Sequence, residues 1–291
     1  WTGGPGAFRI AHIKPETAHE HHRPTLLENL ATDLDLLWRR TRRPDRWIRE
    51  IAVIHQYRRL LAGARNAPGY AALFDPQRTP LVTVRIATYN RGQVLVERTL
   101  PSVLAQTYPH LEVLIVGDHC TDDTAERVRA VQDPRVRFVN LPERGVYPEE
   151  PYARWMVAGA APMNFALREA KGEWLAPLDD DDEFTPDHVE TMLATCRCER
   201  LELCFGIARM MLTTGEWRDV GSAPLRRDHT CHSAVLYWSG LRFMPHDVEA
   251  WRLGEPGDWN LWRRMKWSGV RTGFVPKLVA IHHLERSQWG R

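Results

Sequence analysis

The chain has 291 residues, of which 43% are hydrophobic and 26% are charged, and its formal net charge is +2. This composition is ordinary for a soluble globular protein, and the length suffices for a large buried core. The small net charge excludes a global basic field, so we expect no nucleic-acid partner. No apolar run approaches the roughly 18 residues needed to cross a bilayer.

The five cysteines form no paired C-x-x-C framework. Their number is odd, and Cys196 and Cys198 stand two residues apart in a predicted helix, where their side chains point in different directions. We therefore expect free thiols in a reducing compartment, and hence a cytoplasmic protein. The residues given show no charged-then-apolar secretory leader.

Residues 1–79 are predicted to form an N-terminal extension, made of an irregular arm and a helical hairpin. The first 23 residues carry Gly, Pro and His without a period, whereas apolar side chains follow at helical spacing. One helix is expected from about Thr25, and a second from near Asp45 until Gly63 ends it. The apolar stripe of the second helix consists of Trp47, Ile48, Ile51, Ile54, Leu60 and Leu61.

A basic turn from Arg39 to Arg43 joins the two predicted helices, and Trp38 and Trp47 flank it. Such a turn is suited to weak contact with an anionic membrane surface, which would place the protein peripherally at the membrane. The alternative is an ordinary solvated turn of a helical hairpin.

From Pro80 onward the sequence alternates between strand and helix patterns. Strands are predicted at residues 81–87, 111–117, 136–141 and 173–178, and helices at 94–106, 124–132 and 163–170. This rhythm predicts an α/β fold with a mostly parallel, doubly wound sheet flanked by helices. We expect one large domain over residues 80–291, with halves at 80–185 and 186–291.

The second half of this domain has fewer and less regular elements. The predicted elements are a helix at 186–197, strands at 203–211 and 234–238, a helix at 258–267, and two short final strands at 271–275 and 278–282.

Four consecutive aspartates, Asp179 to Asp182, follow an apolar predicted strand. Adjacent carboxylates on an extended chain repel by about 3 kcal/mol at an effective dielectric of 20. The run therefore favours a bound cation, and carboxylate ligands suit Mg²⁺ or Mn²⁺. In an extended chain Asp179 and Asp181 would face one way, and Asp180 and Asp182 the other. The alternative is an acidic loop that caps a helix beginning near Thr185.

Polar residues also follow two other predicted strands. Thr88, Tyr89 and Asn90 come after one strand, and Asp118 comes after the next. Ligands of doubly wound sheets bind beyond the carboxyl ends of the strands. The shared position favours a ligand site for the aspartate run over a surface loop.

Six segments carry a further pattern, in this order along the chain: VTVRIATYNR from Val82, LPSVLAQTY from Leu100, residues 114–124, Asn164 with the later AKGEW, LDDDD from Leu178, and GDWNLWR from Gly257. Together they resemble the motifs of the family 2 glycosyltransferases, which have the GT-A fold. The resemblance covers roughly Pro80 to His283 and leaves residues 1–78 outside it. It implies that residues 80–185 form the nucleotide-sugar half of the domain and residues 186–291 the acceptor half.

The resemblance also implies roles for individual residues. Those expected to bind the nucleotide-sugar donor are Ala87, Thr88, Tyr89, Asn90, Asp118, Arg144, Asn164, Asp179 and Asp180. Those expected to hold a divalent metal, Mn²⁺ or Mg²⁺, are Asp181 as the direct ligand, together with Asp179, His282 and His283. Asp258 is expected to be the general base.

Three features depart from the family pattern. Gly117 replaces the first Asp of a D-D pair, and His119 and Cys120 replace Gly-Ser, all in the nucleoside region. Gly257 replaces the Glu of an E-D pair. Residues 146–162 are an insertion, which we interpret either as a lid or acceptor loop or as passive surface.

The function implied by the resemblance is metal-dependent, inverting sugar transfer. The donor would be a uridine- or thymidine-diphosphate sugar, and the acceptor would be a hydroxyl of a carbohydrate or glycosylated small molecule. A carboxylate that takes the acceptor proton on the face opposite the leaving group inverts the anomeric centre. Asp258 suits this role, and it also suits an N-cap of the helix that follows.

Two other functions stay open. A sugar-1-phosphate nucleotidyltransferase shares the α/β build, but it would need a Gly-rich phosphate loop after the first strand, which residues 87–92 lack. A noncatalytic carbohydrate or nucleotide binder on the same scaffold fits the changes to Gly117 and Gly257. A zinc site is not expected from His229, Cys231 and His232, because their spacing matches no standard pattern and indicates a loop near the acceptor.

Overall fold

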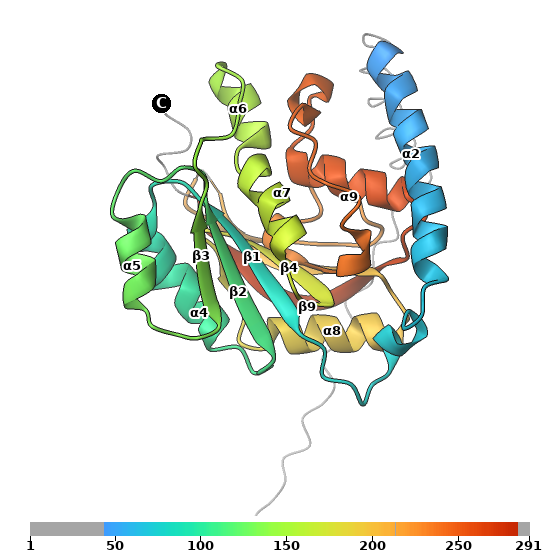
Figure 1. Cartoon of the computed structure of the whole chain (residues 1–291), viewed down its shortest axis with the longest axis horizontal. Coiled ribbons are helices and arrows are strands. Elements are labelled where there is room, and N and C mark those ends of the chain that lie inside the picture. Colours follow the sequence, from blue (N-terminus) through green and yellow to red (C-terminus); the bar gives the residue numbers. More distant parts are fainter. Residues whose placement is uncertain (1–43, 213, 285–291) are drawn as a thin grey trace, which may run out of the picture.

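The structure is a computed structural model that describes residues 44–212 and 214–284. Over these ranges the chain forms one nine-stranded sheet with helices on both faces (Figure 1). The strand order is β3-β2-β1-β4-β8-β6-β9-β5, and β7 pairs with β6. The predicted arm, the first helix of the predicted hairpin and the basic turn from Arg39 to Arg43 lie outside the described residues.

The first four strands of the sheet run parallel to one another. β1 (Val82–Thr88) lies between β2 (Leu111–Gly117) and β4 (Trp174–Asp179), and β3 (Val136–Asn140) pairs with β2. β1, β2 and β4 are buried along almost their whole length, which explains their continuous apolar sequences, because helices cover both faces of a parallel sheet.

The second half of the chain adds mostly antiparallel strands to β4. These are β5 (Glu183–Phe184), β6 (Leu203–Met211), β7 (Trp217–Val220), β8 (Val235–Trp238) and β9 (Thr272–His282). β8 pairs antiparallel with both β4 and β6, whereas β9 runs parallel to β6. The predicted α/β class and the mostly parallel sheet are therefore confirmed. The two short strands expected at the C-terminal end are one strand, β9, whose register with β6 shifts around Ile207.

Helices lie on both faces of the sheet (Figure 1). α7 (Ala160–Glu169) and α9 (Gly257–Ser268) cover one face, and α8 (His188–Cys198) covers the other. The remaining elements of the domain are α3 (Gly92–Val94), the π-helical turn η2 (Leu95–Thr99), α4 (Leu100–Leu104), α5 (Thr124–Ala130), α6 (Pro151–Val157), and the 3₁₀ turns η3 (His232–Ala234), η4 (Ser239–Leu241) and η5 (Ala250–Leu253). Helix α6 falls within the insertion and was not predicted.

α2 (Pro44–Arg65) is the second helix of the predicted hairpin, and it packs along α9. Ile54, Tyr57 and Leu61 are buried, whereas Ile48 is 65% exposed and Leu60 is 41% exposed. The predicted apolar stripe is therefore wrong in part, because the buried face follows the spacing 54, 57 and 61. Gly63 does not end the helix, which runs on to Arg65.

The extension shares the core of the sheet domain. Tyr57 and Leu61 of α2, and Leu73 and Phe74 of η1 (Ala71–Phe74), belong to the same apolar cluster as the central strand residues and Trp174. Among residues 44–212 and 214–284, no helix combines the length and the apolar character needed to cross a membrane.

Candidate functional site

Three neighbouring strands end at the same edge of the sheet and bring polar residues together. The register places Ala87 of β1 opposite Asp179 of β4. The Thr88 hydroxyl donates a hydrogen bond to the Asp180 carboxylate at 2.7 Å, and the backbone N–H of Asp118 donates to the Thr88 carbonyl at 2.8 Å. The strand ends therefore meet as the sequence predicts.

Asn90 connects the turn after β1 to the turn after β2. Its side-chain oxygen accepts a hydrogen bond from the backbone N–H of Thr121 at 2.8 Å. Asn90 and His119 have positive φ angles of 52° and 60°, a conformation that glycine adopts most easily. His119 stands where the related motif has glycine, so the substitution keeps the turn and adds an imidazole.

The Asp118 carboxylate holds the segment that follows β3. It accepts hydrogen bonds from the backbone N–H of Gly145 at 2.8 Å and from the Tyr147 hydroxyl at 2.7 Å. Burial, together with the negative charge of Asp118, raises the pKa of Tyr147, so the hydroxyl keeps its proton. The guanidinium of Arg144 stacks on the Tyr89 ring at 3.7 Å, which places these two predicted residues together at the edge of the site.

The four aspartates do not alternate along an extended chain. The backbone turns directly after β4, where the N–H of Asp182 donates to the Asp179 carbonyl at 3.2 Å. As a result Asp180 and Asp181 both contact the guanidinium of Arg91, at 3.1 Å and 2.9 Å. The expected alternation is wrong because a turn replaces the extended backbone.

Asp182 is fully buried and has its own set of partners. Its carboxylate accepts hydrogen bonds from the Ser233 hydroxyl at 2.5 Å and from the backbone N–H of His283 at 3.1 Å, and it pairs with Nδ1 of His282 at 3.0 Å. These contacts lead to η3 and β9 rather than to α8, whose N-cap position is taken by Asp187. The structure therefore contradicts the alternative that the aspartates form an acidic loop capping this helix.

Asp179 to Asp182 and His282 form one charged centre, called the centre below. The charges of these side chains influence one another strongly. Burial raises the pKa of Asp180 to about 7, although Arg91 acts to lower it. Burial and the neighbouring aspartates also raise the pKa values of Asp179 and Asp181. Burial alone would lower the pKa of His282, but the surrounding aspartates raise it to about 9. The centre therefore favours added positive charge.

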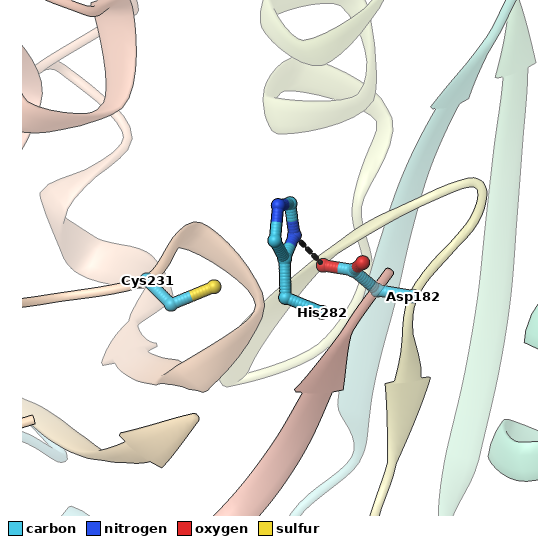
Figure 2. A group of neighbouring side chains, drawn as sticks. All are labelled: Asp182, Cys231 and His282. Atoms are coloured by element: carbon cyan, nitrogen blue, oxygen red, sulfur yellow. Dashed lines mark hydrogen bonds and ion pairs between the residues drawn. The ribbon is translucent and has the colours of Figure 1, made fainter. Parts of the chain in front are cut away.

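Asp182, Cys231 and His282 form a group that is suited to a metal ion (Figure 2). Their ligand atoms all lie within 4.8 Å of one another, and they come from the turn after β4, the residue before η3 and the end of β9. His282 was predicted as a ligand, whereas Asp182 and Cys231 were not. Cys231 could not be found from the sequence, because its neighbours in space are far from it along the chain.

The other predicted metal ligands lie close to this group but have other contacts. The Asp181 carboxylate accepts a hydrogen bond from Arg91 at 2.9 Å. The ring Nε2 of His283 pairs with Glu183 at 2.7 Å. Asp179 lies near enough to influence the pKa of His282. Of the two histidines, His282 is thus the one whose ring lies in the group.

Asp258 lies in the first turn of α9 rather than at its N-cap position, which is Pro256. Burial raises the pKa of Asp258, and hydrogen bonding from the Trp259 backbone N–H acts in the opposite direction. The charges of Asp258 and His282 also influence each other, so α9 brings the predicted base to the metal group.

Asn164 has a different environment from the other predicted donor-binding residues. Its side-chain amide donates to the carbonyl of His246 at 2.9 Å and accepts from the backbone N–H of the same residue at 2.8 Å. Both polar atoms therefore join α7 to the segment before η5, and the structure does not bring Asn164 into contact with the strand-end residues described above.

Close packing explains why glycine stands at positions 117 and 257, where the family pattern has acidic residues. A Cβ on Gly117 would lie 2.5 Å from the side-chain oxygen of Asn140, which accepts a hydrogen bond from the Cys120 backbone. A Cβ on Gly257 would lie 3.3 Å from the carbonyl of Met156 in α6. The insertion therefore occupies the space beside Asp258, and glycine at 257 allows this approach.

The insertion forms an ordered helix beside the site. The Glu150 carboxylate caps α6 by accepting hydrogen bonds from the two backbone N–H groups at 152 and 153. Met156 packs with Ala250 of η5 in a small apolar cluster. Tyr152 and Trp155 are 54% and 43% exposed, and their rings stack at 5.7 Å with an angle of 16° between the planes.

The sequence pattern of the family described as Glycosyl transferase family 2 matches residues 83–148 and 154–210. The succinoglycan biosynthesis protein ExoO of Rhizobium meliloti (strain 1021) is 36% identical over 116 residues, which are 40% of this chain and 30% of that protein. A chondroitin synthase of Escherichia coli is 37% identical over 122 residues, which are 40% of this chain and 15% of that protein. The chain thus matches well under half the length of these relatives.

Solved structures show the same fold. TarS 1-349 of S. aureus, in complex with UDP-GlcNAc, has a TM-score of 0.57 at 18% identity, over 71% of this chain and 59% of that one. The mannosyltransferase PcManGT of Pyrobaculum calidifontis, in complex with GDP-Man and Mn²⁺, has a TM-score of 0.54 at 18% identity, over 88% of this chain and 68% of that one. The chain therefore has the GT-A fold and contains a region, residues 83–148 and 154–210, that resembles glycosyl transferase family 2.

Proposed function

We propose that the protein is a metal-dependent, inverting glycosyltransferase. It transfers a sugar from a nucleoside-diphosphate donor, uridine- or thymidine-linked, to a hydroxyl group of an acceptor carbohydrate or glycosylated small molecule. The observation that carries the proposal is the meeting of three groups at one edge of the sheet: the strand-end residues around Thr88 and Asp118, the aspartate turn with His282, and Asp258 on α9.

The residues of the centre fit a divalent cation. Asp182 and His282 would hold it, with Asp179 and Asp181 as further proposed oxygen ligands from the same turn. When bound, the cation supplies positive charge to the departing diphosphate. The fit rests on the crowding of the buried carboxylates, whose raised pKa values indicate a centre short of positive charge. The Mn²⁺ in the PcManGT complex supports this choice of metal.

Donor binding is proposed at the edge formed by the turns after β1 and β2. Stacking of Arg144 on Tyr89 offers a flat surface for a nucleobase, and Asn90 and Asp118 offer hydrogen-bonding groups. The UDP-GlcNAc bound to TarS supports a nucleotide-sugar donor, although the base and the sugar for this chain are our proposal.

Asp258 is proposed to accept the proton of the acceptor hydroxyl. A buried carboxylate whose pKa is raised binds a proton more readily than an exposed one, and this suits a general base. Its position in the first turn of α9 brings it close enough to His282 for the two charges to influence each other. Attack from that side, opposite the diphosphate, would invert the anomeric centre.

The exposed Tyr152 and Trp155 rings support a carbohydrate acceptor. Aromatic faces pack well against sugar rings because the ring C–H groups are apolar. The end of α6 touches Gly257, next to Asp258, so this stacked pair lies on an element that borders the proposed base. We therefore interpret the insertion as an acceptor-binding element. Membrane-surface contact through the turn from Arg39 to Arg43, and a cytoplasmic location, stay predictions.

The decisive experiment measures nucleoside-diphosphate release with UDP-, dTDP- and GDP-sugars, with and without Mn²⁺ and an oligosaccharide acceptor. We expect release that needs the metal, one nucleotide class and the acceptor. Pyrophosphate release from a nucleoside triphosphate and a sugar phosphate would instead identify a nucleotidyltransferase. Metal-dependent thermal stabilisation by a nucleotide sugar, without turnover under any condition, would identify a noncatalytic binder.

A further inference from the structure

Cys231 places a sulfur atom beside two potential metal ligands that the proposed function already uses. Its thiol points towards the His282 ring (Figure 2), and its sulfur lies within 4.8 Å of ligand atoms of both Asp182 and His282. The side chain is 6% exposed. The sulfur therefore lies inside the centre rather than on the surface.

A carboxylate, an imidazole and a thiol together favour one class of cation. The aspartate turn alone, which offers only oxygen ligands, favours another class. Mg²⁺ and Mn²⁺ prefer oxygen ligands, which the aspartates supply. Thiolate sulfur and imidazole nitrogen are preferred by zinc and chemically similar ions. Three protein ligands with a free fourth position are also the usual number for a zinc ion that remains open to a further ligand.

Two of the three ligands, Asp182 and His282, are already held by other contacts. Ser233 and the His283 backbone hold the Asp182 carboxylate, and this carboxylate pairs with His282. Such second-layer hydrogen bonds orient ligands before a metal arrives.

We propose that Cys231 is a third protein ligand, together with Asp182 and His282, for a thiophilic divalent cation such as Zn²⁺ or Co²⁺. On binding, the S–H bond breaks, a sulfur–metal bond forms, and the thiol proton passes to solvent. A consequence, which rests on the proposed function, is that this cation competes with the Mn²⁺ or Mg²⁺ that supports transfer.

Cobalt is the direct probe, because a thiolate bound to Co²⁺ gives a charge-transfer absorption band in the near ultraviolet. Titrating the whole chain with Co²⁺ should produce this band with one cobalt per chain. Cys231→Ser should remove the band and weaken Zn²⁺ binding by more than about tenfold, a loss that even outer-layer changes can reach. The matched control is Cys198→Ser, because Cys198 is an exposed free thiol at the end of α8.

Two results would overturn the proposal: a band that persists in Cys231→Ser, or a wild-type chain that binds Co²⁺ without the band. X-ray absorption on the zinc-loaded wild-type protein gives a test that needs no variant, and it should detect sulfur at about 2.3 Å from the metal. A zinc shell of nitrogen and oxygen alone would contradict the proposal.

The competition is tested separately by adding Zn²⁺ to the Mn²⁺-supported transfer reaction. Inhibition should need more Zn²⁺ in Cys231→Ser than in the wild-type chain or Cys198→Ser. If no chain transfers sugar with any metal, the proposed function fails, while the cobalt band still decides whether Cys231 is a ligand.

Discussion

The carboxylate of Glu50 in α2 accepts a hydrogen bond at 2.5 Å from the guanidinium of Arg263 in α9, and both side chains are buried. Arg263 also binds Glu255, which precedes α9 and in turn accepts a hydrogen bond from Asn260. The N-terminal extension is thus connected by buried charges to the helix that carries Asp258. This relationship makes α2 a support for the proposed base.

Replacing Glu50 by Gln should destabilise the protein. The change removes one of the two carboxylates that pair with Arg263, so we expect a decrease of about 1–3 kcal/mol in the free energy of unfolding, measured with urea. The control is Glu126→Gln, because Glu126 pairs with Arg129 at 3.5 Å on the surface. An exposed pair contributes roughly 0–1 kcal/mol. Equal losses in the two variants would contradict the structural role of Glu50.

The same contact shows why sequence patterns described the extension only in part. Apolar spacing predicts the existence of α2 but assigns Ile48 and Leu60 to its buried side. The structure buries Glu50 instead, because Arg263, more than 200 residues away, neutralises it. An acidic residue in a sequence is assigned to the exposed face of a helix as long as its distant partner is unknown.

The sequence also predicts only part of the site, because some of its contacts join residues that are far apart along the chain. Strand ends and motif order located the edge where Thr88, Asp118 and the aspartate turn meet. Two things depended on distant segments and could not be predicted: the turn that directs Asp181 to Arg91, and the approach of Cys231 to Asp182. Regular elements follow from local sequence, whereas ligand sets depend on loop packing.

Replacing Asp258 by Asn should slow transfer strongly and leave donor binding intact. Loss of a general base typically slows a reaction by about 10²–10⁴-fold. Initial rates and donor-induced thermal shifts should be measured on the same preparation. Asp45→Asn is a matched control, because Asp45 is an exposed acid in the first turn of α2. Transfer at the wild-type rate by Asp258→Asn would rule out the assigned base.

Replacing Asp182 by Asn should remove the effect of Mn²⁺ on thermal stability. The wild-type melting temperature should rise with Mn²⁺, because a ligand that binds only the folded state stabilises it. The amide keeps the shape of the carboxylate but loses the charge that faces His282. Asp187→Asn is the control, since Asp187 lies before α8 and pairs with Lys277. A full Mn²⁺ shift in Asp182→Asn would place the metal elsewhere.

Replacing Trp155 by Ala should raise the KM for the acceptor without changing the KM for the donor. Removal of one stacked ring costs about 0.5–1.5 kcal/mol, which corresponds to a roughly 2- to 13-fold increase. Tyr152→Phe keeps the neighbouring ring and should change neither constant. An unchanged acceptor KM in Trp155→Ala would support the alternative that the insertion is passive surface.

His188 should make the protein less stable in mild acid. Its ring is fully buried, stacks on Phe184 at 3.7 Å and donates from Nδ1 to the carbonyl of Val279 at 2.9 Å. Burial lowers the pKa of His188 to about 4. An unfolded chain takes up this proton near pH 6.5, so the stabilising contribution is complete above that pH and is lost as the pH falls towards 4.

The loss amounts to at most about 3 kcal/mol from this residue, because one pKa unit corresponds to about 1.4 kcal/mol. His188→Phe preserves the stacking, and the Val279 carbonyl keeps the backbone N–H of Thr185 as a donor at 3.0 Å. Urea unfolding at pH 7 and pH 4.5 should therefore show a smaller difference in this variant than in the wild-type chain. His110→Gln at an exposed position should leave the difference unchanged. An identical pH dependence in His188→Phe and the wild-type chain would mean that the pKa of His188 is the same in the folded and unfolded states.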